Sequence, residues 1–212
     1  MLLAIDTSTG TSVAVVDRDR ATGELRRLAE TGTADTMRHA EVIGGFIHDA
    51  LESAGVRPDA LSGVAAGMGP GPYTGLRVGI AAAHAFALGI DRPFVPVVSH
   101  DAIAWSWYRD GGTGGLQVVT DARRREFAIS EYDGLDVDGL PVRTDGPRLV
   151  AREAVPATRG IRFDAALVPA GAIGMLAELA FAAGRHPLAD DAPIYLRAPD
   201  VTPAVAAKKV LR

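Results

Sequence analysis

Hydrophobic residues along the first half of the chain follow two patterns in turn. Short apolar runs, many of them β-branched, predict strands, and apolar residues repeated every three or four positions predict helices. The order is that of an α/β mixed sheet with helices packed on it. Strands are predicted at Leu2–Ile5, Thr11–Val16, Leu25–Ala29, Gly63–Gly67 and Phe94–Val98, and helices at Thr36–Ala54 and Thr74–Leu88.

The second half begins with a shorter copy of this pattern. Gln117–Asp121 repeats the apolar-then-aspartate pattern of Leu2–Asp6 at a spacing of about 115 residues, and a strand at Glu126–Tyr132 follows. The remainder has a Pro- and Gly-rich segment at Leu140–Pro147, an apolar run at Ala165–Val168 and a predicted helix at Ile173–Ala183. We expect two similar sub-domains, the second one trimmed, over residues 1–100 and 101–197, and a tail at 198–212.

The composition of the 212-residue chain, 48% hydrophobic and 23% charged, is ordinary for a globular protein. The formal net charge of −4 gives no overall attraction to nucleic acid or to an anionic membrane. Cysteine is absent, and the sequence shows neither a signal-peptide pattern nor an apolar run long enough to span a bilayer. A cytoplasmic protein with no membrane contact is expected.

Basic residues in the body of the chain are all arginine. The only lysines, Lys208 and Lys209, lie in the tail, so no lysine in the body can hold a phosphate or form a Schiff base. The one basic triplet is Arg123-Arg124-Arg125. For this triplet, a solvated turn is favoured over an RNA contact.

The most informative segment is the loop Gly67–Gly79, which follows a predicted strand and opens a predicted helix. Loops of this kind direct backbone N–H groups and the positive end of a helix toward a phosphate. However, Pro70 and Pro72 carry no N–H, and the spacing fits neither the dinucleotide-binding nor the P-loop fingerprint. The loop therefore has the shape of a phosphate cradle without its usual donors.

Asp6 ends the first predicted strand and precedes the small polar run Thr7-Ser8-Thr9-Gly10. A carboxylate beside hydroxyl groups can hold a metal-bound phosphate. The alternative, to which we give equal weight, is that Asp6 caps the turn into the next strand. The candidates for a degenerate phosphate loop are Asp6, Thr7, Ser8, Gly69 and Gly71.

Other kinds of catalytic or metal site find little support in the sequence. No two of the five histidines stand at the i, i+4 spacing that places two imidazoles on one metal. Ser8 lacks the G-x-S-x-G elbow of a nucleophile, and Asp121-Ala122-Arg123 does not complete an aspartic-protease pair with Asp6-Thr7. We expect no metal site and no catalytic residue.

The predicted helix Gly75–Leu88 is apolar on nearly its whole surface, with Arg77 and His84 as its only polar side chains. A helix of this kind is covered on more than one side. Its stripe of glycine and alanine lets another backbone approach closely, which gains dispersion contacts. The cover is either the second sub-domain or a partner chain, and we weight the partner chain at least equally.

Four segments of the chain together resemble one family. Leu3–Ser8, Gly69–Gly79, Asp121-Ala122-Arg123 and Tyr195-Leu196-Arg197 are similar to bacterial tRNA threonylcarbamoyladenosine biosynthesis proteins of the TsaB type. The resemblance implies the actin-like (ribonuclease H-like) duplicated fold shared with sugar kinases and heat-shock chaperones. That fold is built from two halves of β-β-β-α-β-α-β type, in agreement with the order predicted from the hydrophobic pattern.

The resemblance implies a non-catalytic subunit that binds and supports a catalytic paralogue, TsaD. In this family TsaD transfers a threonylcarbamoyl group to the adenosine beside the anticodon of tRNA, and an ATPase, TsaE, joins the assembly. TsaD carries an H-x-x-x-H metal motif, whereas this chain has His100 followed by Ala104. We expect indirect contact with tRNA and no cofactor in the isolated chain, with ATP bound only weakly or at the complex interface.

The resemblance also implies pairing with TsaD through the two N-terminal helices. Because helices with exposed apolar faces often pair with themselves when the partner is absent, we expect a homodimer of the isolated chain. From the helical projection we expect these residues at the partner interface: Arg38, Val42 and Gly45 on the first helix, and Gly75, Val78, Ala82 and Ala85 on the second. The competing prediction, from Asp6 and the glycine loop, is an ATP-dependent small-molecule phosphotransferase of the actin-like superfamily. A zinc peptidase is a third and weaker alternative.

Overall fold

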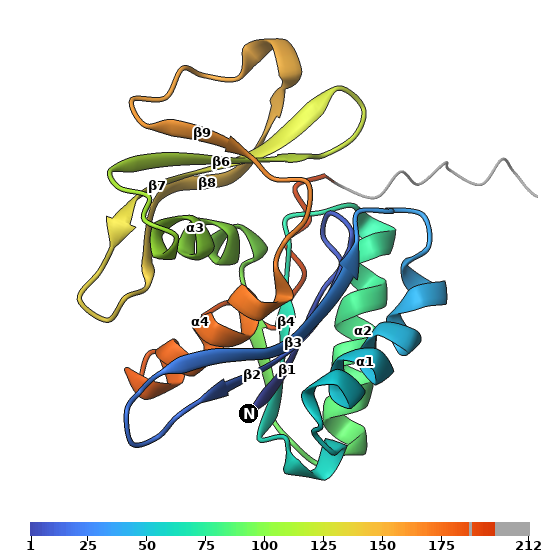
Figure 1. Cartoon of the computed structure of the whole chain (residues 1–212). Coiled ribbons are helices and arrows are strands. Elements are labelled where there is room, and N and C mark those ends of the chain that lie inside the picture. Colours follow the sequence, from blue (N-terminus) through green and yellow to red (C-terminus); the bar gives the residue numbers. More distant parts are fainter. Residues whose placement is uncertain (187, 198–212) are drawn as a thin grey trace, which may run out of the picture.

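The computed structural model describes residues 1–186 and 188–197, which form two mixed sheets with four α-helices (Figure 1). The strands are β1 (Leu2–Asp6), β2 (Thr11–Arg18), β3 (Leu25–Thr33), β4 (Gly63–Gly67), β5 (Phe94–Val97), β6 (Gly115–Asp121), β7 (Glu126–Leu135), β8 (Pro141–Ala151) and β9 (Ile161–Asp164). The helices are α1 (His39–Ala54), α2 (Tyr73–Gly89), α3 (Ser99–Arg109) and α4 (Ala170–Ala182). The predicted mixed α/β class is confirmed.

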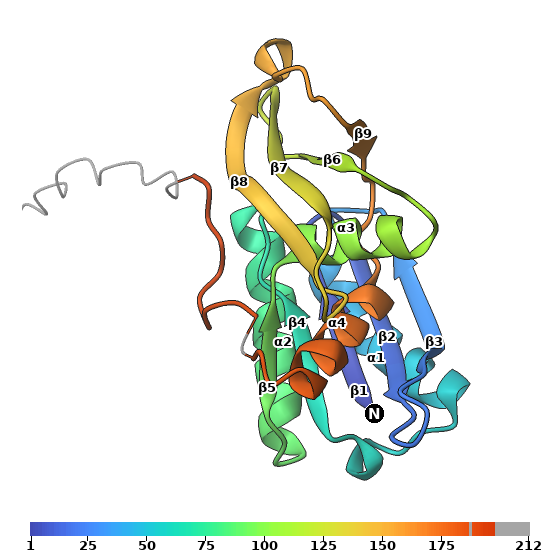
Figure 2. The same ribbon diagram turned by 90° about the vertical axis from the view of Figure 1, so that its left-hand side faces the viewer.

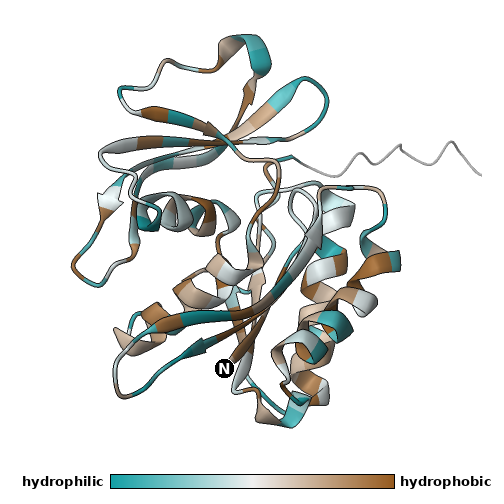
Figure 3. Cartoon of the chain, in the orientation of Figure 1, coloured by the Kyte–Doolittle hydropathy of each residue, from teal (hydrophilic) through white to brown (hydrophobic). Residues whose placement is uncertain are grey.

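The first sheet has the strand order β3-β2-β1-β4-β5, with β1 antiparallel to β2 and parallel to β4. Because successive strand residues point to opposite faces, Leu3 and Ile5 pack with α1 and α2, whereas Leu2 and Ala4 pack on the side of α4. Figure 3 shows hydrophobic residues along β1 and both hydrophobic and hydrophilic residues on α1. Burial on both faces explains why β1 is a continuous apolar run up to Asp6.

Helix α4 follows the second sheet in the sequence but packs on the first sheet (Figure 1). Gly174 allows the close approach, since a Cβ at this position would lie 2.6 Å from Val16 Cγ2 and 3.1 Å from Ala4 Cβ. The chain therefore returns to the first sheet to complete its core.

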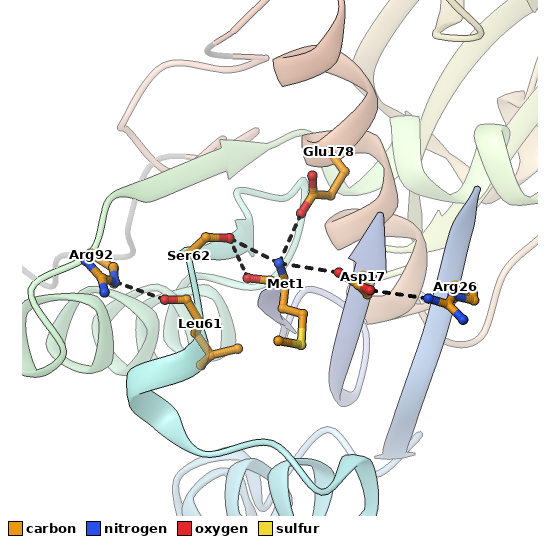
Figure 4. A network of polar contacts seen from close by, with 7 residues as sticks. All are labelled: Met1, Asp17, Arg26, Leu61, Ser62, Arg92 and Glu178. Atoms are coloured by element: carbon orange, nitrogen blue, oxygen red, sulfur yellow. Dashed lines mark hydrogen bonds and ion pairs between the residues drawn. The ribbon is translucent and has the colours of Figure 1, made fainter. Parts of the chain in front are cut away.

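A polar network at the edge of the first sheet also joins α4 to the strands (Figure 4). The N-terminal ammonium of Met1 lies 3.7 Å from Asp17 Oδ1 on β2 and 3.7 Å from Glu178 Oε1 on α4. The same ammonium donates to Ser62 Oγ over 3.2 Å. These ion pairs are long and their groups are partly solvated, so they contribute little free energy. Apolar packing of α4 on the sheet, as at Gly174, is the main contact.

The second sheet repeats the pairing of the first with fewer strands. Its order is β8-β7-β6-β9, and β6 is antiparallel to β7 and parallel to β9. Figure 2 shows helix α3 between this sheet and α4. The duplication read from the sequence is thus present in the strand pairing.

A buried histidine fixes α3 to the second sheet. His100 is fully buried, and its Nδ1 and Nε2 each lie 2.8 Å from a hydroxyl oxygen, that of Ser130 on β7 and that of Thr120 on β6. Burial, followed by the charge of Arg143, lowers the pKa of His100 to about 3. The ring is therefore neutral near pH 7 and serves as a structural bridge between the two hydroxyl groups.

The sequence prediction was incomplete in the second half. Helix α3 begins two residues after β5 with no turn residue between them, so the hydrophobic pattern gave no sign of a new element. The edge strands β8 and β9 were also missed, because β8 contains Gly146-Pro147 at an irregular register and β9 has only exposed residues. Helix α1 begins at His39 and not at Thr36.

The predicted division into residues 1–100 and 101–197 stays a prediction. The predicted tail at 198–212 lies outside the described residues. Within the part of the chain that the structure describes, no helix is both long and apolar enough to cross a bilayer.

Replacing glycine by alanine should change the free energy of unfolding in opposite directions on α4 and on α1. Gly174→Ala should lower the free energy of unfolding by about 1–3 kcal/mol, because the added methyl group overpacks the contact with Val16. Gly44→Ala on α1, where a Cβ would meet nothing within 4 Å, should raise it by about 0.5–1 kcal/mol. Urea denaturation of both variants at one protein concentration checks the pair, and equal shifts would contradict the packing described for α4.

Candidate functional site

The candidate phosphate-loop residues lie together at the carboxyl ends of the parallel strands. Asp6 is buried, and its Oδ1 accepts hydrogen bonds from Ser8 N at 2.8 Å and Ser8 Oγ at 2.6 Å. Its Oδ2 accepts from Ser99 Oγ at 2.6 Å. Both carboxylate oxygens are therefore engaged within the protein. The sequence interpretation missed Ser99, which lies two residues after β5 at the same end of the sheet as Asp6.

Thr7 joins this corner to the first turns of α2. Its Oγ1 donates to Gly75 O at 2.7 Å and accepts from Gly79 N at 3.1 Å. A Cβ on Gly79 would collide with Thr7 Oγ1, so glycine is required for this contact. One hydroxyl group thus sets how α2 meets the end of β1.

The Gly-Pro-Gly-Pro loop lies directly on the residues that follow β1. Gly69 has a φ of +97°, which glycine adopts without strain, and its N–H donates to Ser99 Oγ at 3.0 Å. A Cβ on Gly71 would lie 2.6 Å from Ser8 O. The backbone segments therefore touch where a phosphate cradle would need open space, and the polar groups of the loop and of Asp6–Ser8 bond to one another.

Burial raises the pKa of Asp6 to about 6, while the hydrogen bonds from Ser8 and Ser99 lower it by less. The buried carboxylate is thus held by three donors at a cost in desolvation. This balance fits the capping role that the sequence left open for Asp6.

A cavity of about 360 Å³ lies on the outer side of the loop, between the loop and the β6–β7 turn. Its lining includes Gly71, Tyr73, Thr120, Arg123 and Arg197. Its walls come from the loop and the start of α2, from the second sheet with its β6–β7 turn, and from the segment after α4. The cavity is separate from the closed contact beneath the loop.

Helices α1 and α2 lie side by side on the outer side of the first sheet (Figure 1). Among the predicted interface residues Arg38, Gly45 and Ala85 are exposed, and Val42, Val78 and Ala82 are half-buried. Gly75 is different: it is buried, and a Cβ there would lie 2.9 Å from Thr7 O and 3.0 Å from His39 Nε2. Gly75 therefore faces inward, and the outward assignment made for it from the helical projection does not fit its position.

The helical projection also missed residues of the outer face. Leu88 is 84% exposed, and Ala81 and Gly44 are exposed as well. Leu88 stands at the i+7 position from Ala81 and Ala85 at the i+4 position, so all three lie on one stripe of α2. That spacing could have identified Leu88 from the sequence.

Comparisons with known proteins agree with this geometry. Residues 34–140 match the model of the family described as TsaD, tRNA N6-adenosine threonylcarbamoyltransferase. An uncharacterized protein of Mycobacterium tuberculosis is 36% identical over 95% of this chain and 94% of its own length. The tRNA threonylcarbamoyladenosine biosynthesis protein TsaB of Haemophilus influenzae is 32% identical, and the match covers 61% of this chain and 52% of that protein.

Among solved structures, YeaZ from Pseudomonas aeruginosa is similar with a TM-score of 0.73 and 26% identity, over 92% of this chain and 99% of that chain. The paired sheets and this match define a protein of the duplicated actin-like class. The family match and the relatives define it further: the chain belongs to the TsaB/TsaD family of tRNA threonylcarbamoyladenosine proteins and is TsaB-like. The predicted family resemblance and fold class are confirmed.

The buried carboxylate of Asp6 predicts a defined pH dependence of stability. Its pKa is raised to about 6 in the folded protein from 3.8, so its contribution to stability is present at low pH and is lost as the pH rises through about 6. Wild-type protein should therefore lose roughly 2 kcal/mol relative to Asp6→Asn between about pH 4 and about pH 7.

Urea denaturation across this pH range measures the difference between the two proteins. Asp49→Asn, which removes an exposed carboxylate on α1, is the matched control. A difference between wild type and Asp6→Asn that stays constant, or that grows in favour of the wild type as the pH rises, would contradict the description of this site.

Proposed function

We propose that this chain is the non-catalytic subunit of a tRNA threonylcarbamoyladenosine-forming complex, in which it binds and supports a TsaD-type catalytic paralogue. The observation that carries the proposal is the outer face of α1 and α2. This face exposes the apolar side chains of Ala81, Ala85 and Leu88 on α2 and the glycines Gly44 and Gly45 on α1. Exposed apolar side chains grouped on one stripe of a helix favour a protein interface.

The small residues favour a helix-to-helix contact. A Cβ on Gly44 or Gly45 would meet nothing within 4 Å, so this part of α1 is open to a partner backbone. Close backbone approach adds many weak dispersion contacts. Arg38 pairs with Glu41 across 2.9 Å at the start of α1, which gives the apolar face a polar border. In the absence of the paralogue, the same face would pair with a second copy of the chain.

The chemistry at the sheet edge supports an accessory role. The oxygens of Asp6 are held by Ser8 and Ser99, and both ring nitrogens of His100 are held by hydroxyl groups. By the family resemblance, His100 would correspond to the first histidine of the metal motif in the catalytic paralogue, and Ala104, one turn later, is a buried alanine. A catalytic site would need these groups to be free for a substrate or a metal.

The remaining members of the assembly follow from the same proposal. A TsaE-type ATPase would join the pair, and ATP would bind at the complex interface or only weakly to the isolated chain. We propose that the complex is cytoplasmic, and the proposed tRNA substrate supports this location. No resident cofactor is proposed for this chain.

An ATP-dependent phosphotransferase is the second candidate, and the 360 Å³ cavity beside the glycine loop is the observation in its favour. Calorimetric titration of the isolated protein with ATP and Mg²⁺ separates the two. Micromolar binding would support the phosphotransferase, and the accessory role predicts a flat titration.

The interface proposal predicts a large effect from Ala85→Arg. The substitution places a charge on the apolar face, where its desolvation opposes binding, and should weaken association with the TsaD-type paralogue by at least about 100-fold. Ala157→Arg, at an exposed position beyond the second sheet, is the matched control and should bind as the wild type does. Both affinities can be measured by surface plasmon resonance, and equal binding by the two variants would refute this interface.

A further inference from the structure

The turn between β6 and β7 is built from arginine in a conformation that disfavours it. Arg123, Arg124 and Arg125 have φ values of 62°, 52° and 61°. Left-handed backbone costs a non-glycine residue about 1–2 kcal/mol, and three in succession is unusual. Glycine or asparagine would form such a turn at lower cost.

Hydrogen bonds hold this turn in one shape. Ala122 N donates to Glu126 O at 3.1 Å, Glu126 N donates to Arg123 O at 3.0 Å, and Arg123 N donates to Asp121 Oδ1 at 2.9 Å. The three arginine side chains are exposed and project from this hydrogen-bonded backbone. Strain retained at a firmly bonded position indicates a functional constraint on the side chains.

Positive charge gathers around the turn although the whole chain is acidic. Arg152 Nη2 lies 2.9 Å from Asp121 Oδ1, and Arg197 pairs with Glu126, so the neighbouring carboxylates are already engaged. Arg123 donates to Thr36 Oγ1 at 2.8 Å, which is a neutral group, and it forms no ion pair with another described residue. The side chain of Arg125 has no hydrogen bond or ion pair within residues 1–186 and 188–197.

We call Arg123, Arg124, Arg125, Arg152 and Arg197 the arginine cluster, and part of it borders the 360 Å³ cavity. Arg123, Arg124 and Arg197 line that cavity together with the glycine loop. Guanidinium groups match phosphate oxygens in geometry and charge. Several guanidinium groups along one turn beside a cavity can contact several phosphates in succession. This arrangement fits the backbone of a nucleic acid better than it fits a single anion.

We propose that the arginine cluster binds the phosphate backbone of an RNA strand, which, on the basis of the proposed function, belongs to the tRNA substrate. The geometry revises the solvated turn favoured from the sequence, because a solvated turn needs neither the strained backbone nor the added arginines. Each phosphate contact releases counterions, so binding through the cluster depends on salt concentration.

The test uses the full chain and a fluorescent, unmodified tRNA transcript, with anisotropy measured over a series of KCl concentrations. The variant R124Q/R125Q removes two guanidinium groups and keeps non-glycine residues in the turn. Its tRNA affinity should fall about tenfold, and the slope of log K against log salt should fall by about 1.4. The control R20Q/R57Q removes two exposed arginines elsewhere and should match the wild type.

A glycine variant separates binding from folding. Arg125→Gly relieves the left-handed strain, so it should raise the melting temperature while it weakens tRNA binding. Equal salt slopes for wild type and R124Q/R125Q would overturn the proposal. Displacement of the tRNA by micromolar ATP would also overturn it, because it would assign the cluster to a free nucleotide.

Association with the TsaD-type paralogue is measured separately on the same variants. R124Q/R125Q should keep wild-type affinity for the paralogue. Failure of the wild-type chain to bind the paralogue would count against the proposed function alone, since tRNA binding is read from the isolated chain.

Discussion

The structure depends on the contact between the segment Gly67–Gly79 and the residues that follow β1. Asp6 bonds to Ser8 and Ser99, and Thr7 bonds to the first turns of α2. These short contacts require glycine, because a Cβ on Gly71 or Gly79 would collide with Ser8 or Thr7. Burying the Asp6 carboxylate at this contact removes it from water, which disfavours its charged form and raises its pKa.

The same contact connects the interior to two surfaces. It sets where α2 begins, and α2 together with α1 presents the outer face that we propose as the site of the partner protein. The opposite side of the loop borders the cavity and the arginine cluster. A loop that bonds to its own protein in place of a phosphate can thus position a protein interface on one side and an RNA contact on the other.

Much of this arrangement could be predicted from the sequence, because burial on the first sheet gives β1 and β2 continuous apolar runs and gives α1 a helical apolar period. The candidate residues Asp6 to Ser8 and Gly69 to Gly71 follow from strand ends and turn chemistry, which are local signals. The partners of Asp6 and Gly75 could not be predicted so directly. Ser99 and His39 meet them through tertiary packing, and no local pattern encodes that contact.

The edge strands and the arginine turn show a second limit of sequence reasoning. β9 is exposed and β8 is mostly half-buried at the sheet edges, so neither strand carries a clear apolar pattern. The sequence shows three consecutive arginines at Arg123–Arg125, but it does not show that their backbone is left-handed. The left-handed backbone is what distinguishes a constrained site from an ordinary solvated turn.

We propose that this chain acts through a catalytic partner. Reconstituted threonylcarbamoyl transfer to tRNA by the TsaD-type paralogue and the TsaE-type ATPase, with and without this chain, tests this dependence. Transfer should require the chain and be lost when it is omitted. Full transfer activity of the paralogue without the chain would show that no such dependence exists.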